Sequence, residues 1–127
     1  MIFNKIENFP SAYIYRQNTS LIKTLIMVTC HIKYVIDPFQ LEVFEQYGKK
    51  WIELVNRFGG QHHGYFMPSE GANNIAYALF SFESLAEYEN YRKLILTDEE
   101  CVATFKLATD TKCILSYERT FLRPVFN

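Results

Sequence analysis

Long hydrophobic runs are missing from this sequence of 127 residues, and so is an excess of charge of either sign. No stretch approaches the roughly 20 apolar residues that a membrane-spanning helix needs, so we expect no membrane span. Thirteen Lys and Arg residues stand against fourteen Asp and Glu residues, and no basic run occurs. Proteins dedicated to nucleic acids or anionic membranes carry basic patches, so this balance disfavours both classes.

Cysteine is scarce, and the three cysteines present are Cys30, Cys101 and Cys113. An odd number of widely spaced cysteines without a C-x-x-C pair is not a disulfide framework, so we expect buried thiols and a cytoplasmic protein. The sequence also lacks His-x-His, H-E-x-x-H and the phosphate-binding pattern G-x-x-x-x-G-K-[ST]. We therefore expect neither a metal site nor a cofactor.

Aromatic residues are abundant, at 17% of the chain, with eleven Phe and nine Tyr. Hydrophobic residues make up 49%, which is enough to build a core in a single domain of this length. Aromatic side chains in such numbers fill a core, line an apolar pocket or build an interface.

The first 26 residues differ from the rest because polar and turn-forming residues interrupt them and neither helical nor strand periodicity is sustained. We predict that residues 1–26 form an N-terminal extension and that the compact domain spans residues 27–127. The extension is explained either by translation from an upstream start codon or by an arm that packs on a partner.

Residue patterns after position 27 predict four strands and three helices. Asp37 and Pro38 are typical of a helix start, Gly59-Gly60 of a helix stop, and Ser84 with Glu87 and Thr97 with Glu100 of two capping boxes. The predicted strands cover 28–36, 61–67, 75–82 and 113–123, and the predicted helices cover 38–58, 85–96 and 98–108.

This order is β-α-β-β-α-β with an extra helix before the last strand, which is the ferredoxin-like α+β arrangement with an antiparallel sheet. Helices cover one face of such a sheet, so the other face should be polar. The third strand is apolar on both faces, with Tyr77 and Leu79 on one and Ala78 and Phe80 on the other. We therefore predict a homodimer, in which two sheets close into a dimeric α/β barrel.

Candidate binding residues are the polar side chains at sheet positions. His62-His63 is the most unusual pair, and strict alternation along a strand places His63 on the same face as Tyr65. Glu118 and Arg119 face opposite sides of the last strand. Two alternatives stay open: one of them points into the barrel, where its charge needs a partner or a ligand, or both lie on an exposed rim. Arg92 is interpreted as a solvated helix residue. The full set of ligand-binding candidates is His31, His63, Tyr65, Tyr77, Ser81, Glu118 and Arg119. A core or interface role for the histidines stays open.

Several segments resemble the NIPSNAP family. They are Gly59-Gly60-Gln61-His62-His63-Gly64-Tyr65-Phe66, Glu70-Gly71-Ala72-Asn73-Asn74-Ile75, and the opening and closing strands around Tyr34-Val35-Ile36-Asp37-Pro38 and Glu118-Arg119-Thr120-Phe121-Leu122-Arg123-Pro124. The resemblance implies a ferredoxin-like fold that assembles as a dimeric α/β barrel. It also implies kinship with small monooxygenases of the antibiotic-biosynthesis type.

Three functions remain open at this point. The first is binding of a small apolar or aromatic organic molecule in a cavity of the dimeric barrel. The second is a cofactor-independent monooxygenase or isomerase in which a His or Tyr acts as general acid or base. The third is a protein-interaction module.

Overall fold

The computed structural model describes residues 22, 23 and 25–126 of the chain. Most of the predicted N-terminal extension therefore lies outside the described residues, although residues 22–23 and 25–26 are helical. The proposed domain boundary at residue 27 stays a prediction.

The predicted order of strands and helices is confirmed. The elements are β1 (Val28–Ile36), η1 (Pro38–Gln40), α3 (Leu41–Arg57), β2 (Gln61–Phe66), β3 (Ile75–Phe82), α4 (Leu85–Leu94), α5 (Glu99–Thr111) and β4 (Ile114–Leu122). Helix α5 is the predicted extra helix before the last strand.

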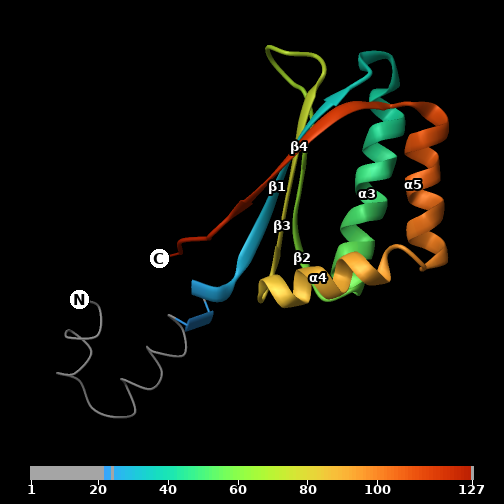
Figure 1. Cartoon of the computed structure of the whole chain (residues 1–127). Helices are drawn as coiled ribbons and strands as arrows, with labels where there is room; N and C mark the ends of the chain where they lie inside the picture. Colours follow the sequence, from blue (N-terminus) through green and yellow to red (C-terminus); the bar gives the residue numbers. More distant parts are fainter. Residues whose placement is uncertain (1–21, 24, 127) are drawn as a thin grey trace, which may run out of the picture.

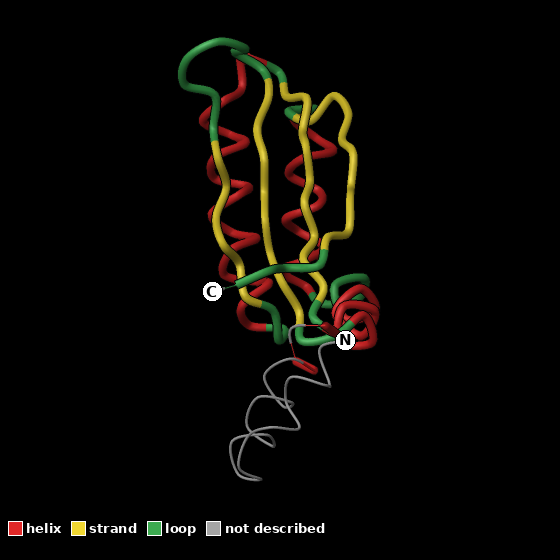
Figure 2. Tube along the Cα trace, turned by 90° about the vertical axis from the view of Figure 1, so that its left-hand side faces the viewer, coloured by secondary structure: helices red, strands yellow, loops and turns green. Residues whose placement is uncertain are grey.

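The four strands form one antiparallel sheet in the order β2-β3-β1-β4. Helices α3 and α5 run side by side along one face of this sheet, and α4 closes its lower end (Figure 1). Turned by 90°, the sheet lies in front of the helices, and no helix covers the face toward the viewer (Figure 2). The fold is therefore α+β and ferredoxin-like, as predicted. The two faces are termed the helix side and the open face below.

Local hydrogen bonds define where the helices begin. Two of these helix starts differ from the sequence prediction. Asp37 accepts a hydrogen bond from the backbone N–H of Phe39, but the first turn after it is the 3₁₀ segment η1 rather than an α-helix. Asp98, not Thr97, caps α5, because its carboxylate accepts the N–H of Cys101 at 3.0 Å. A carboxylate at the N-cap also favours the positive end of the helix dipole.

The hydrophobic core lies on the helix side. Strand β3 contributes Ala76, Ala78, Phe80 and Phe82, all buried. Helix α3 supplies the opposing layer through Phe44, Tyr47, Trp51, Leu54 and Val55, which recur at helical spacing as predicted. Burying each of the larger side chains stabilises the fold by about 1.5–3 kcal/mol relative to exposure, so this layer holds the helices on the sheet.

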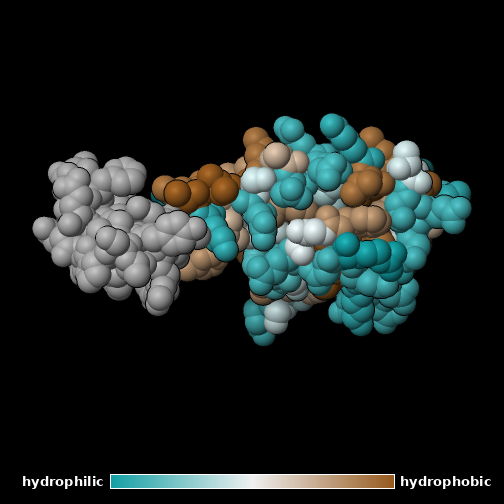
Figure 3. Space-filling view, turned by 90° about the horizontal axis from the view of Figure 1, so that it is seen from below, coloured by the Kyte–Doolittle hydropathy of each residue, from teal (hydrophilic) through white to brown (hydrophobic). Residues whose placement is uncertain are grey.

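No helix of the described residues covers the open face, and the segment that follows β4 crosses only its lower end (Figure 2). Phe66 remains 52% exposed there and Tyr77 36%. Strand β3 is thus apolar on both faces, but the described residues cover its open face only in part, because Tyr77 stays exposed there whereas Ser81 is buried. Seen from below, by contrast, the molecule is mostly hydrophilic, with hydrophobic residues in separate groups (Figure 3).

Candidate ligand pocket between the sheet and the helices

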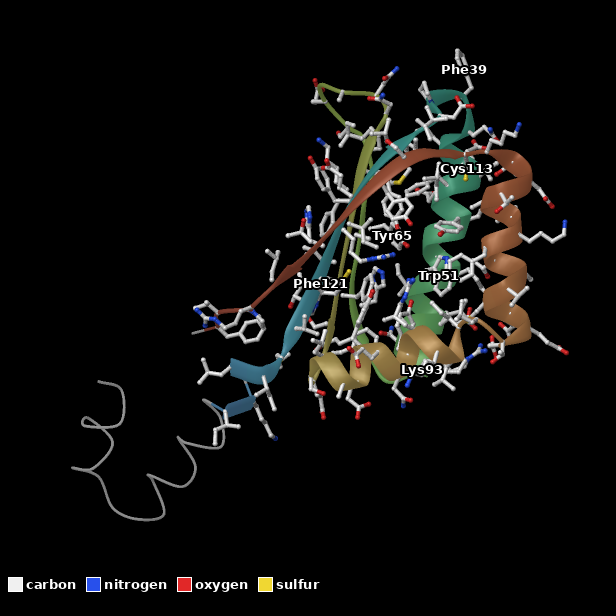
Figure 4. The ribbon with its side chains drawn as sticks, in the orientation of Figure 1. Phe39, Trp51, Tyr65, Lys93, Cys113 and Phe121 are labelled. Atoms are coloured by element: carbon white, nitrogen blue, oxygen red, sulfur yellow. The ribbon has the colours of Figure 1, made fainter. Side chains whose placement is uncertain are left out.

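Two adjacent cavities on the helix side share part of their lining. The outer chamber has a volume of about 330 Å³ and is lined by Tyr34, Tyr47, Arg92, Phe105, Ala108, Thr109, Ile114, Tyr117 and Arg119. The inner recess, of about 40 Å³, shares five of these residues and adds a deeper wall that includes Trp51, His62, Tyr65, Phe80, Tyr91 and Ile95. In Figure 4, Trp51 on α3 and Tyr65 on the sheet both lie in the side-chain layer between the sheet and the helix.

A β-bulge in β2 decides which histidine reaches this pocket. His62 pairs with Phe80 and Gly64 with Leu79, so His63 is an extra residue without a partner in register. Gly64, at φ +118°, supplies a backbone conformation that residues with a Cβ rarely adopt. The bulge places His62 on the helix side, where its ring stacks on Tyr65 at 5.0 Å between centroids.

The prediction that His63 shares a face with Tyr65 is therefore wrong. His63 points to the open face, where its Nε2 lies 2.7 Å from the hydroxyl of Ser81. Strict alternation fails here because a bulge shifts the side-chain period by one residue. Gly64, directly after the histidine pair, was the available signal, since glycine inside a strand often marks a bulge.

Tyr65 is fixed against helix α3 by a close approach. Its ring lies so near Gly48 that a Cβ added there would fall 2.9 Å from Cγ of Tyr65. Phe44 meets the same ring edge-on at 5.8 Å. Burial raises the pKa of the Tyr65 hydroxyl well above its usual value, so the group stays protonated at neutral pH.

Two arginines line both cavities. Arg119 is opposite Ile32 in the β1–β4 register, which places it on the helix side, and its guanidinium lies 5.5 Å from the centre of the Tyr117 ring. Arg92 on α4 was expected in solvent, and the structure corrects this, because the helix turns it toward the pocket. Its spacing from Tyr88, Tyr91 and Ile95 matches the buried face of a helix and was the signal for this position.

Burial controls the protonation of the side chains around the recess. Burial, together with the nearby His63, lowers the pKa of His62 to about 4. It raises the pKa of Cys30 to about 11 and that of Tyr34 to about 12, with Arg119 acting in the opposite direction on both. At neutral pH these three groups are uncharged.

The seven candidate residues separate into two groups. Tyr65 and Arg119 line the helix-side pocket. The other five lie on the open face: the ring of His31 is 5.3 Å from that of Tyr77, Ser81 bonds to both Thr29 and His63, and Glu118 faces Lys33 across the strands. The single pocket expected from sequence is thus divided by the sheet.

The described residues hold no group of three His, Cys, Asp or Glu side chains placed to bind a metal ion. None of the helices in this part of the chain is long and apolar enough to cross a bilayer.

The sheet order, the helices on one face and the pocket between them define a ferredoxin-like α+β protein. The NIPSNAP family model matches residues 29–126, so the chain belongs to the NIPSNAP family. No curated protein matches the chain.

Solved structures with the same fold share little sequence with this chain. An uncharacterized NIPSNAP-like domain protein from Burkholderia xenovorans is 20% identical, with a TM-score of 0.67 over 80% of this chain and 87% of its own. A nipsnap family protein with unknown function from Agrobacterium tumefaciens is 19% identical, with a TM-score of 0.68 over 79% and 89%. A putative antibiotic biosynthesis monooxygenase from Nitrosomonas europaea is 8% identical, with a TM-score of 0.62 over 79% and 91%. At these identities the likeness concerns the fold alone.

Proposed function

We propose that this protein binds a small organic molecule with an aromatic or apolar body in the outer chamber on the helix side. The observation that carries the proposal is a chamber of about 330 Å³ with tyrosine and phenylalanine walls and two arginines. Ligand sites combine apolar walls with a few polar groups and begin at about 300 Å³. The chamber lies within one protomer, so the proposed site differs from the barrel cavity predicted from sequence.

Native mass spectrometry of freshly purified protein tests this proposal. We expect a reproducible additional mass that is lost in Ala108→Phe, because Ala108 on α5 lines the chamber and a phenyl ring there fills it. Ala103→Phe is the matched control, since Ala103 lies on the same helix but is exposed and outside the pocket. Equal retention of the mass in both variants would place the ligand elsewhere.

An enzymatic role is the second candidate, as a monooxygenase or isomerase without a cofactor. The observation in its favour is His62, whose neutral ring faces the recess and is placed to polarise a carbonyl group of a bound substrate. Substrate-dependent oxygen uptake or a spectral change should then disappear in His62→Phe and persist in His63→Ala. A turnover that depends on His63 instead would contradict this assignment.

The assembly we propose is a homodimer formed through the open face. Its support is the apolar surface that the described residues leave partly or fully exposed, including Tyr77, Leu79 and Phe66. Tyr77→Glu should convert the dimer to a monomer in size-exclusion chromatography with light scattering. Val102→Glu, an equivalent change at an exposed position of α5, should not. A monomeric wild-type protein would rule the proposal out.

We place the protein in the cytoplasm because its three cysteines suit a reducing compartment. Cys30, Cys101 and Cys113 are buried and unpaired with one another.

A further inference from the structure

Three nitrogen atoms in the inner recess share an unusual property. In the part of the chain that the structure describes, the buried side-chain nitrogen and oxygen atoms without a hydrogen-bond partner are Trp51 Nε1, His62 Nε2 and Arg119 Nε. All three residues line the inner recess. A buried polar group left unsatisfied costs about 1–3 kcal/mol, so three around one small space call for a shared explanation.

All three atoms are hydrogen-bond donors at neutral pH. An indole nitrogen and a guanidinium nitrogen can only donate. His62 is fixed as a donor by its surroundings, because its Nδ1 accepts the backbone N–H of Gly64 at 2.9 Å. Since burial lowers the pKa of His62 to about 4, the ring is neutral and its single proton is on Nε2.

The charge around the two cavities is positive, so it favours the same kind of ligand as the three donors do. Arg92 and Arg119 line both cavities, and none of the Asp and Glu residues that the structure describes lines either. Within the described residues, neither arginine forms an ion pair. Cys30 cannot neutralise them, because burial holds its thiol protonated. A positive pocket of low dielectric favours a negatively charged ligand.

The volumes of the recess and of the outer chamber indicate which part of such a ligand each of them would hold. The recess, at about 40 Å³, has room for a group of two or three heavy atoms, since one water needs roughly 10–15 Å³ on this measure. The outer chamber, at about 330 Å³, is walled by aromatic rings and takes a larger flat body. A small group rich in acceptors on an aromatic ring fits this division.

We infer that the pocket binds its ligand as an aromatic oxyanion, with a carboxylate or phenolate oxygen held by His62, Arg119 and Trp51 in the recess and the ring in the outer chamber. This inference rests on the proposed function, because it names the class of molecule that occupies the same chamber. Charge-assisted hydrogen bonds to an oxyanion are about twice as strong as neutral ones, so the anion should be clearly preferred over an uncharged analogue of the same shape.

The experiment uses matched probe pairs on the full-length protein at pH 8. One pair is cinnamate and cinnamamide, and the other is 4-nitrophenolate and 4-nitroaniline, so the two arms separate carboxylate from phenolate. Trp51 is the only tryptophan, so the chain has a single indole N–H resonance in a ¹H–¹⁵N NMR spectrum. Titration of that resonance reports on the recess itself, and calorimetry gives each dissociation constant.

We expect at least one anion to bind tenfold or more tightly than its neutral counterpart and to move the indole resonance downfield. The preference should fall close to onefold in Arg119→Gln and return in part in Arg119→Lys. His62→Phe keeps an aromatic ring at the position and should also weaken binding of the anion. Arg123→Gln is the matched control, because Arg123 is exposed just beyond β4 and outside both cavities.

The outcomes separate this inference from the proposed function. Equal binding of anions and neutral probes, with the indole resonance shifted by both, would overturn the oxyanion inference and leave the binding proposal intact. Failure of all four probes to bind would overturn both. A preference for anions that Arg123→Gln abolishes and Arg119→Gln retains would place the anion site outside the recess and overturn the inference.

Discussion

Gly48, in the middle of α3, lies directly against the ring of Tyr65, and the substitution Gly48→Ala tests this contact. The new Cβ would stand 2.9 Å from Cγ, 3.0 Å from Cδ2 and 3.1 Å from Cδ1 of that ring. Ordinary contacts between carbon atoms are about 3.5–4.0 Å, so the ring or the helix must move by about half an ångström or more. The ring is also held by Phe44 and His62, which limits its movement.

Two effects of opposite sign determine the result. Alanine inside a helix is favoured over glycine by about 1 kcal/mol, whereas overpacking a core costs about 1–3 kcal/mol. Because three ring atoms are approached at once, we expect overpacking to win and the free energy of unfolding to fall by about 1 kcal/mol. Urea unfolding followed by circular dichroism measures this change.

A double-mutant cycle separates the two effects. In a Tyr65→Leu background the ring is gone, so Gly48→Ala should become stabilising by up to about 1 kcal/mol through helix propensity alone. The predicted sign reversal amounts to a coupling of about 2 kcal/mol between the two positions. If Gly48→Ala stabilises the wild-type protein and the coupling is near zero, the close packing of Tyr65 on α3 is refuted.

Three further predictions concern pH, a buried hydroxyl and a helix cap. Because His62 has a lower pKa in the folded protein, about 4 against 6.5, only the unfolded chain gains its proton as the pH falls between these values. Stability should therefore drop by about 1–2 kcal/mol from pH 7 to pH 4, after allowance for partial exposure of the ring, and much less in His62→Phe. Ser81→Ala should cost about 1–2 kcal/mol in urea unfolding, since the buried Thr29 hydroxyl loses its partner at 2.7 Å, and an unchanged midpoint would contradict this. Asp98→Ala should lower the free energy of unfolding by about 1 kcal/mol, because α5 loses its N-cap hydrogen bond from the N–H of Cys101. Asp110→Ala, at the far end of α5, should not.

The fold was predictable from sequence because its signals are local and repeated. Helix α3 carries an apolar residue at nearly every turn, and β1 and β3 are rich in β-branched and aromatic residues, so element types and order followed directly. The cap of α5 was displaced by one residue because Thr97 and Asp98 are both good N-caps. Only the backbone geometry decides between two neighbouring cap residues.

The candidate site was less predictable because it depends on which face each strand residue occupies. The chemistry of Arg119 and Tyr65 identifies them as candidates, but their place beside His62 depends on a bulge that a simple alternation rule omits. The prediction that Arg92 faces solvent is wrong because it relies on the usual exposure of charged helix residues. The position of Arg92 toward the pocket follows from the tertiary packing of α4, on which Tyr88 and Tyr91 are buried.

The bulge in β2 also affects how related sequences should be compared. It adds one residue between the Gly59-Gly60 helix stop and β3, so Tyr65 returns to the helix side one position later than in a regular strand. A relative without the bulge would need one residue fewer in this segment to keep an equivalent tyrosine in place. An alignment without a one-residue gap at the bulge would pair His63 with a residue that faces the pocket in such a relative. Strand length around Gly64 is therefore a better guide to equivalent positions than residue identity.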